Sequence, residues 1–189
     1  TDFTIPIPFP FLFQGTARTD VSIDDNGGLA FGTTNTIGFS NGAMSGAGDG
    51  LYPFWDDLDA GDIYTETLGT APNRKFAIQW NNRPHYFGVA GQEVTFQAVL
   101  DEATSEIYFY YNDVEFGGSQ ATNDFGASAT IGVAGPNQDL EVSFNNGDFL
   151  TNNTCAHFYY TDCPTPSNLM VTEFNNDSIV VTWTDGVSS

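Results

Sequence analysis

Apolar and polar residues alternate in a series of short segments along this chain. Alternation of this kind places successive side chains on opposite faces of a β-strand that has one buried face. The clearest segments are residues 75–80, 94–100, 106–111, 129–133, 140–144 and 156–160. Turn-forming Gly, Asn and Asp separate them, and no long stretch carries a helical stripe. The pattern predicts an all-β protein, an antiparallel and jelly-roll-like β-sandwich.

The first third of the chain predicts an edge strand, a hairpin and a long loop. Prolines at positions 6, 8 and 10 cannot donate ladder hydrogen bonds, so the opening segment is expected at a sheet edge or as an extended entry. Asn26-Gly27 lies between the apolar segments 21–23 and 29–31, which favours a tight hairpin. Residues 33–50 are rich in Gly, Ser, Thr and Asn and predict a loop.

The composition changes near residue 163, where two prolines flank a threonine. Such a segment forms a semi-rigid, extended linker. Beyond it, residues 169–172 and 178–183 predict two strands, too few to close a core of their own. We therefore expect a β-sandwich domain at 1–162, a linker at 163–168 and the start of a second β-module at 169–189, within a longer chain of β-domains.

Charge is strongly unbalanced, with 24 acidic residues against four basic ones and a net charge of −20. Nucleic-acid binding requires basic side chains at the phosphates, so this class is excluded. An anionic membrane surface would repel the protein, and no long apolar run predicts membrane insertion. Solubility, cation binding and tolerance of salt are the interpretations that agree with this charge.

Cys155 and Cys163 are the two cysteines, and they lie eight positions apart. In an oxidising compartment they would form a disulfide, and elsewhere two reduced thiols are expected. His85 and His157 are the only histidines, and there is no Cys-x-x-Cys pair, so a zinc site is not predicted.

The segment 52–64 carries four carboxylates directly after an aromatic cluster. The carboxylates are Asp56, Asp57, Asp59 and Asp62. Ca²⁺ takes six to eight oxygen ligands, so this loop is the candidate calcium site. The spacing does not match an EF-hand. In the competing interpretation Asp56 points inward and accepts hydrogen bonds from backbone amides, while the other carboxylates are solvated.

A second candidate site is the segment 81–87, interpreted as an exposed loop. Its candidate ligand-binding residues are Asn82, Arg83, His85 and Tyr86, which combine amide, guanidinium, imidazole and aromatic groups. Trp55 and Trp80 could extend it into an aromatic platform for a sugar, but their positions favour the core.

Catalysis is not expected. Acidic pairs are so frequent that choosing one pair as a glycosidase site would be arbitrary.

Several segments resemble nidogen-type extracellular domains. Residues 9–15 and 21–32 are similar to the opening of these domains, and Tyr-Pro-Phe-Trp-Asp-Asp-Leu-Asp at 52–59 to their aromatic–Asp signature. Residues 95–100, 107–113 and 129–133 are similar to later strands. The resemblance spans about residues 5–160 and implies an extracellular β-sandwich, as found in large secreted bacterial surface proteins and exported proteases. The near-absence of Lys departs from this pattern, so a basic partner-binding surface is not expected.

The last segment is similar to the start of a fibronectin type III domain, in which Trp183 would be the core tryptophan. Arrays of such domains are typical of long surface proteins, so both resemblances imply a secreted, cell-surface location.

Together these observations predict a non-enzymatic module for adhesion to an extracellular glycan or surface protein, stabilised by Ca²⁺. One alternative is an accessory carbohydrate-binding module of an exported hydrolase, which a downstream catalytic domain would favour. Another is a structural spacer or filament subunit, which self-association and a smooth surface would favour.

Overall fold

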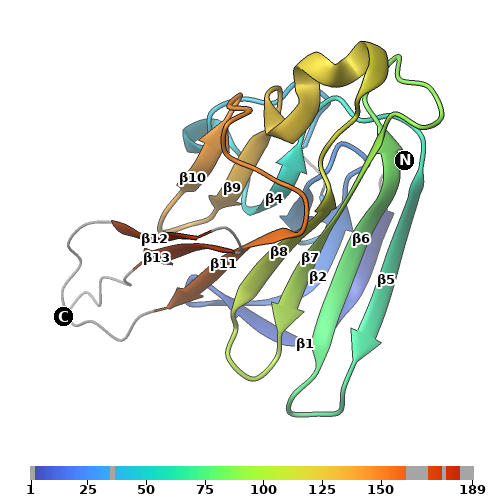
Figure 1. The fold of residues 1–189 in the computed structure, drawn as a ribbon. Helices are drawn as coiled ribbons and strands as arrows, with labels where there is room; N and C mark the ends of the chain where they lie inside the picture. Colours follow the sequence, from blue (N-terminus) through green and yellow to red (C-terminus); the bar gives the residue numbers. More distant parts are fainter. Residues whose placement is uncertain (1–2, 35–36, 161–169, 176–177, 184–189) are drawn as a thin grey trace.

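The structure is a computed structural model that describes residues 3–34, 37–160, 170–175 and 178–183, with the backbone alone from residue 160 onward. The described residues form two sheets (Figure 1). One sheet has six strands in the spatial order β1-β2-β3-β4-β9-β10. Its strands are β1 (Phe3–Phe13), β2 (Thr16–Ile23), β3 (Leu29–Phe31), β4 (Gly50–Trp55), β9 (Thr130–Ala134) and β10 (Leu140–Phe144).

The other sheet has seven strands in the order β12-β13-β11-β8-β7-β6-β5. They are β5 (Asp62–Leu68), β6 (Lys75–Pro84), β7 (Glu93–Asp101), β8 (Ile107–Asp113), β11 (Thr154–Tyr160), β12 (Met170–Asn175) and β13 (Ser178–Trp183). Two short 3-10 segments, η1 (Met44–Gly46) and η2 (Gly118–Gly126), complete the described elements. Among these described strands, all pairs are antiparallel except β11 with β13.

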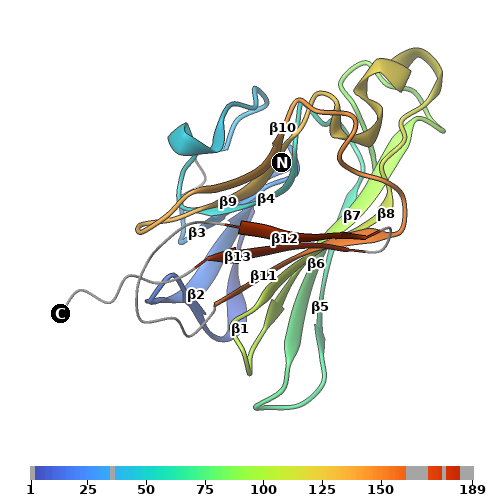
Figure 2. The same cartoon turned by 60° about the vertical axis from the view of Figure 1, so that its left-hand side comes forward.

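The core lies between the two sheets, which form separate facing layers in Figure 2. On β6, alternation buries Phe76, Ile78 and Trp80 and leaves the residues between them on the outer face. Trp80 stacks on Phe96 with ring centroids 5.2 Å apart, and Phe54 of the other sheet stacks on Phe96 at 5.3 Å. The predicted all-β sandwich is therefore confirmed.

The structure also confirms the edge strand and the hairpin. β1 lies at the edge of the six-stranded sheet, and its register with β2 is interrupted between Pro6 and Phe11, where the prolines lack N–H groups. Ile23 pairs with Leu29 across the Asn26-Gly27 turn. The strands at 75–84 and 154–160 are longer than the sequence pattern predicts, since polar residues at their ends join the ladder.

The structure places the last two described strands beside β11. β13 runs parallel to β11, with Ala156 opposite Ile179, and β12 pairs with β13. They extend the seven-stranded sheet of the domain predicted at 1–162. The linker 163–168 lies outside the described residues, so the fibronectin type III assignment and the domain division remain predictions.

Gly27 gives a direct test of how tightly the hairpin is packed on β4. Its φ is +81°, and an added Cβ would lie 1.9 Å from the carbonyl oxygen of Phe54. Gly15 has φ +78° with nothing within 4 Å of its Cβ position, so it is a matched control for backbone strain alone. We expect Gly15→Ala to lower the free energy of unfolding by about 1–2 kcal/mol. Gly27→Ala should lower it clearly further, as measured by urea denaturation. Equal losses would mean that the turn moves away from β4 without cost.

Candidate functional site

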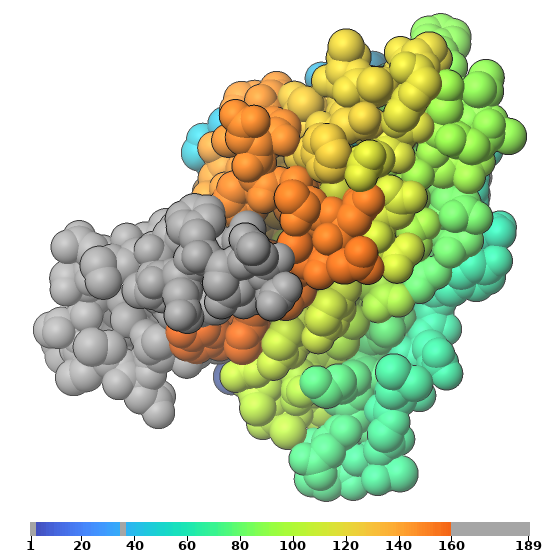
Figure 3. All heavy atoms as spheres, viewed as in Figure 1, coloured from blue at the N-terminus to red at the C-terminus, as the bar shows by residue number. Residues whose placement is uncertain are grey.

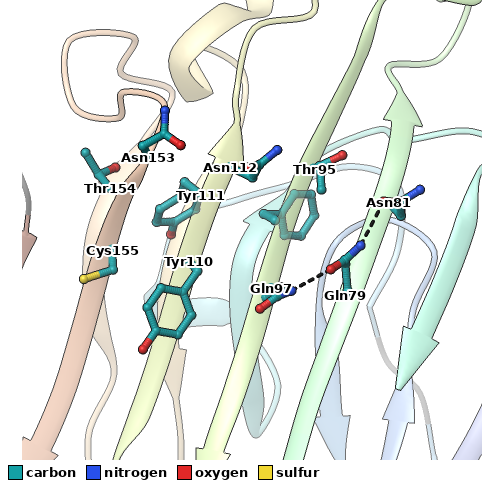
Figure 4. Close-up of a pocket in the computed structure, with 11 residues that line it drawn as sticks. Gln79, Asn81, Thr95, Gln97, Tyr110, Tyr111, Asn112, Asn153, Thr154 and Cys155 are labelled. Carbon is teal, nitrogen blue, oxygen red and sulfur yellow. Dashed lines mark hydrogen bonds between the residues drawn. The ribbon is translucent and has the colours of Figure 1, made fainter. Parts of the chain in front are cut away.

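A groove of about 680 Å³ crosses the outer face of the seven-stranded sheet. In the space-filling view of this face, β6, β7 and β8 lie at the surface (Figure 3). The groove is lined by Gln79, Asn81, Thr95, Phe96, Gln97, Tyr110, Tyr111, Asn112, Asn153, Thr154 and Cys155 (Figure 4). These residues come from β6, β7, β8 and β11 and from the turn before β11.

Strand register brings the central groove residues into one row. Gln79 pairs with Gln97, Gln97 with Tyr110, and Tyr110 with Cys155, across four neighbouring strands. Each of these residues alternates with a buried aromatic or aliphatic side chain, so packing of the core directs them outward. The row therefore presents two carboxamides beside a tyrosine ring.

The carboxamides form a directed chain of hydrogen bonds. Gln97 Nε2 donates to Gln79 Oε1 at 2.5 Å, and Gln79 Nε2 donates to Asn81 Oδ1 at 2.8 Å (Figure 4). The chain fixes the orientation of all three side chains. It leaves Gln97 Oε1 as an acceptor at one end and the Asn81 amino group as a donor at the other. A ligand in the groove would meet both kinds of group.

Tyr110 supplies an aromatic surface next to these amides. Its side chain is 38% exposed, and its ring is seen nearly face-on from the outer side of the sheet in Figure 4. It lies beside Tyr108, with ring planes only 8° apart and centroids at 5.9 Å. Burial raises the pKa of Tyr110, so its hydroxyl is neutral at physiological pH.

All eleven residues that line the groove are uncharged at neutral pH. Burial raises the pKa values of the Cys155 thiol and the Tyr111 hydroxyl, which keeps both groups neutral. On a chain with a net charge of −20, an uncharged concave surface of this size is a local exception. The groove is suited to a polar ligand without charge.

The structure places Asp56 inside the protein, as the structural interpretation of the acidic segment predicts. Asp56 is 3% exposed. Its Oδ1 accepts from the backbone N–H of Asp57 at 2.9 Å, and its Oδ2 accepts from the Ser128 hydroxyl at 2.6 Å. His85 Nε2 lies 3.5 Å from Oδ1. One carboxylate therefore links the end of β4 to two distant loops.

The other three carboxylates of the candidate calcium site are more exposed than Asp56. Asp59 and Asp62 are exposed, and Asp62 accepts from the Tyr64 hydroxyl at 2.9 Å. Burial raises the pKa of Asp57, and the nearby carboxylates of Asp56 and Asp59 raise it further, while His85 opposes them. Within the part of the chain that the structure describes, no group of three or more His, Cys, Asp or Glu could hold a metal ion. This geometry does not fit the proposed calcium cage, and calcium binding stays a prediction.

The candidate loop 81–87 is corrected in part. β6 continues to Pro84, and a bulge between Trp80 and Arg83, with Asn82 at φ +50°, turns Arg83 inward. Arg83 is 3% exposed and donates to the carbonyl oxygens of Gly61 and Asp25 at 2.7 and 2.8 Å. It is a buried structural residue and not a surface ligand-binding group.

The remaining members of that candidate set occupy three different environments. His85 is held against Asp56. Tyr86 is 46% exposed and packs on Phe87, with ring centroids 4.1 Å apart. Asn82 is exposed and accepts a bond from the Thr95 hydroxyl at 3.3 Å, which places it at the border of the groove. The structure does not bring these four residues together as one site.

Two further sequence predictions concern tryptophan and cysteine. Trp55 and Trp80 are 9% and 0% exposed, so their assignment to the core is confirmed. Cys155 lines the groove, whereas Cys163 lies outside the described residues, and the Cys155–Cys163 disulfide stays a prediction.

The sequence pattern alone does not identify the groove residues as a site. Its one indication of this site is that polar residues occupy outward positions in the predicted strands, with Gln79 and Gln97 each in the middle of a strand. Their proximity depends on which strands are neighbours and on the register between them, which alternation within one strand does not specify.

Fold and site together define a β-sandwich domain with an open, uncharged groove on one sheet face. The chain matches the family described as NIDO related over residues 1–184, and it belongs to that family. Family membership indicates an extracellular-type module. No curated protein and no solved structure matches the chain. Among the described residues, no helix is long and apolar enough to cross a membrane.

Removal of the Asp56 carboxylate should destabilise the fold. Asp56→Ala leaves the Asp57 N–H and the Ser128 hydroxyl without their acceptor, which we expect to lower the free energy of unfolding by about 1–3 kcal/mol. Asp59→Ala, an exposed carboxylate of the same segment, is the matched control and should change it by less than about 0.5 kcal/mol. Urea denaturation of the three proteins checks this. If Asp56→Ala left the free energy of unfolding unchanged, these hydrogen bonds would contribute nothing to stability.

The same contact predicts a pH dependence. The Asp56 carboxylate raises the pKa of His85 above 6.5, against the opposing effect of burial. Folded His85 therefore keeps its proton to higher pH than unfolded His85. The stability from this pair is fully present below about pH 6.5 and is lost as pH rises through the folded pKa. Between pH 6 and 8, roughly this window, the free energy of unfolding should fall less in His85→Gln than in the parent protein. Parallel slopes would contradict the coupling.

Proposed function

We propose that this protein is a non-enzymatic, secreted module that binds an extracellular ligand through the groove on the outer face of its seven-stranded sheet. The observation that carries the proposal is the uncharged, concave groove over β6, β7, β8 and β11 on a strongly acidic protein. Its family supports an extracellular setting.

The geometry favours binding over the other predicted roles. Fixed amide and hydroxyl groups beside one exposed ring are the kind of polar groups that orient a ligand in a pocket. A filament subunit or spacer needs no such hollow. Binding of this kind serves equally in an adhesin and in an accessory module of an exported hydrolase, so the binding role is common to both.

The alternation of side chains also explains why the groove is rigid. Gln79, Gln97 and Tyr110 stand on strands whose inner faces are fully buried, so their backbones are fixed by the core. Preorganised groups lose little conformational entropy on binding, which favours affinity for a polar ligand despite the cost of desolvating it.

Adhesion to defined surfaces tests the proposal. Beads carrying the purified protein would be applied to surfaces coated with collagen, fibronectin, mannan or xylan, and their retention under flow would be counted. We expect retention on at least one surface. The double variant Gln97→Ala with Asn112→Ala should reduce it about tenfold, the sum of two lost hydrogen bonds.

Tyr86→Ala is the control, because Tyr86 is an exposed side chain that does not line the groove. It should leave retention unchanged. Retention that the double variant leaves intact would place binding outside the groove, and absence of retention on every surface would contradict an adhesive function.

A further inference from the structure

We infer that the groove binds a neutral oligosaccharide, with one of its sugar rings on Tyr110 and hydroxyl groups of the chain on the amides of Gln97, Gln79 and Asn81. This inference rests on the proposed function and specifies the ligand class. It is carried by four features of the groove: its hydrogen-bonding groups, its aromatic surface, its extent and its lack of charge.

The hydrogen-bonding groups match a sugar. A carboxamide presents a donor and an acceptor side by side, and neighbouring hydroxyl groups on a sugar ring present the same combination. The bonds from Gln97 to Gln79 and from Gln79 to Asn81 hold the three amides in a fixed order. Thr95 and Asn112 add a hydroxyl and a fourth amide to the lining. A ligand rich in hydroxyl groups can pair with these groups without leaving a charge buried.

The aromatic surface is placed for stacking. Tyr110 is 38% exposed, pairs directly with Gln97, and shows its ring face on the outer side of the sheet (Figure 4). Its neighbour Tyr108 is fixed in turn, because its hydroxyl donates to Glu106 at 2.5 Å and its ring stacks on His157 at 4.2 Å. The apolar face of a sugar ring can cover Tyr110 while its hydroxyl groups reach the amides.

The extent of the groove favours a chain over a single sugar. The lining residues come from four adjacent strands, and three spacings of about 4.8 Å make about 14 Å. Asn81 on β6 lies two of these spacings, about 10 Å, from Tyr110 on β8, which is more than a single sugar ring stacked on Tyr110 covers. We therefore expect affinity to rise with the number of sugar units.

The charge distribution selects neutral sugars. No lining residue carries a positive charge that could form an ion pair with a carboxylate or sulfate group, and the net charge of −20 repels such a ligand. Acidic polysaccharides are thus disfavoured both by a lining that offers no positive charge and by the negative net charge of the protein.

Calorimetric titration of the full chain tests the inference. The probes are oligosaccharides of one to six units from mannan, xylan, cellulose and starch, with oligogalacturonate as an anionic series. We expect at least one neutral series to bind, with affinity that rises with length, and oligogalacturonate to bind at least about tenfold more weakly.

Three tyrosine variants locate the bound ring. Tyr110→Ala should weaken binding about tenfold, whereas Tyr110→Phe, which keeps the ring, should retain most of the affinity. Tyr86→Ala, an exposed tyrosine outside the groove, should have no effect. Thermal melts of each variant separate loss of binding from loss of fold.

The failures of the two proposals can be told apart. Groove-dependent retention on collagen or fibronectin without binding of any neutral oligosaccharide would overturn the sugar inference and leave the binding function in place. Oligosaccharide binding that is insensitive to Tyr110→Ala would overturn the proposed site. Binding of oligogalacturonate as strong as that of the neutral sugars would overturn the selection by charge.

Discussion

Packing of aromatic rings between the two sheets is the constraint on which the rest of the structure depends. Trp80 stacks on Phe96, and Phe54 from the opposite sheet stacks on the same ring. Since side chains alternate along a strand, fixing these inward rings fixes the register of β6 against β7, and a slip of one residue would turn them into solvent. The same register sets Gln79 beside Gln97 on the outer face. The arrangement of the groove is thus a direct consequence of how the core packs.

Buried polar groups hold the loops at one end of the sandwich. Trp80 donates its indole N–H to the carbonyl oxygen of Asp24 at 2.8 Å, and Arg83 donates to two further loop carbonyl oxygens. Asp56 accepts from Ser128 and contacts His85. Each bond satisfies a group that burial would otherwise leave unpaired. Side chains that look like surface ligands in the sequence are therefore used by the fold itself.

The distribution of charge separates the groove from the rest of the surface. The 24 acidic side chains of the protein favour solubility in salt, while the groove is lined only by uncharged residues, among them amides, hydroxyl groups and two tyrosines. In an extracellular-type module this arrangement offers an uncharged groove to a polar ligand, on a protein whose net negative charge repels anions. Selectivity then depends on hydrogen bonding and shape and not on ion pairing.

The sequence by itself determined the all-β class, the Asn26-Gly27 hairpin and the burial of Trp55 and Trp80, because each follows from local periodicity or turn chemistry. For the opening segment it left a sheet edge or an extended entry open, and the strand order decided for the edge. The sequence also identified Asp56 as a candidate for a structural carboxylate. Only the tertiary structure decided that Arg83 turns inward, because a bulge reverses its direction. Likewise, only strand order and register bring Gln79, Gln97 and Tyr110 together, since contacts between distant segments are not encoded in the period of any one strand.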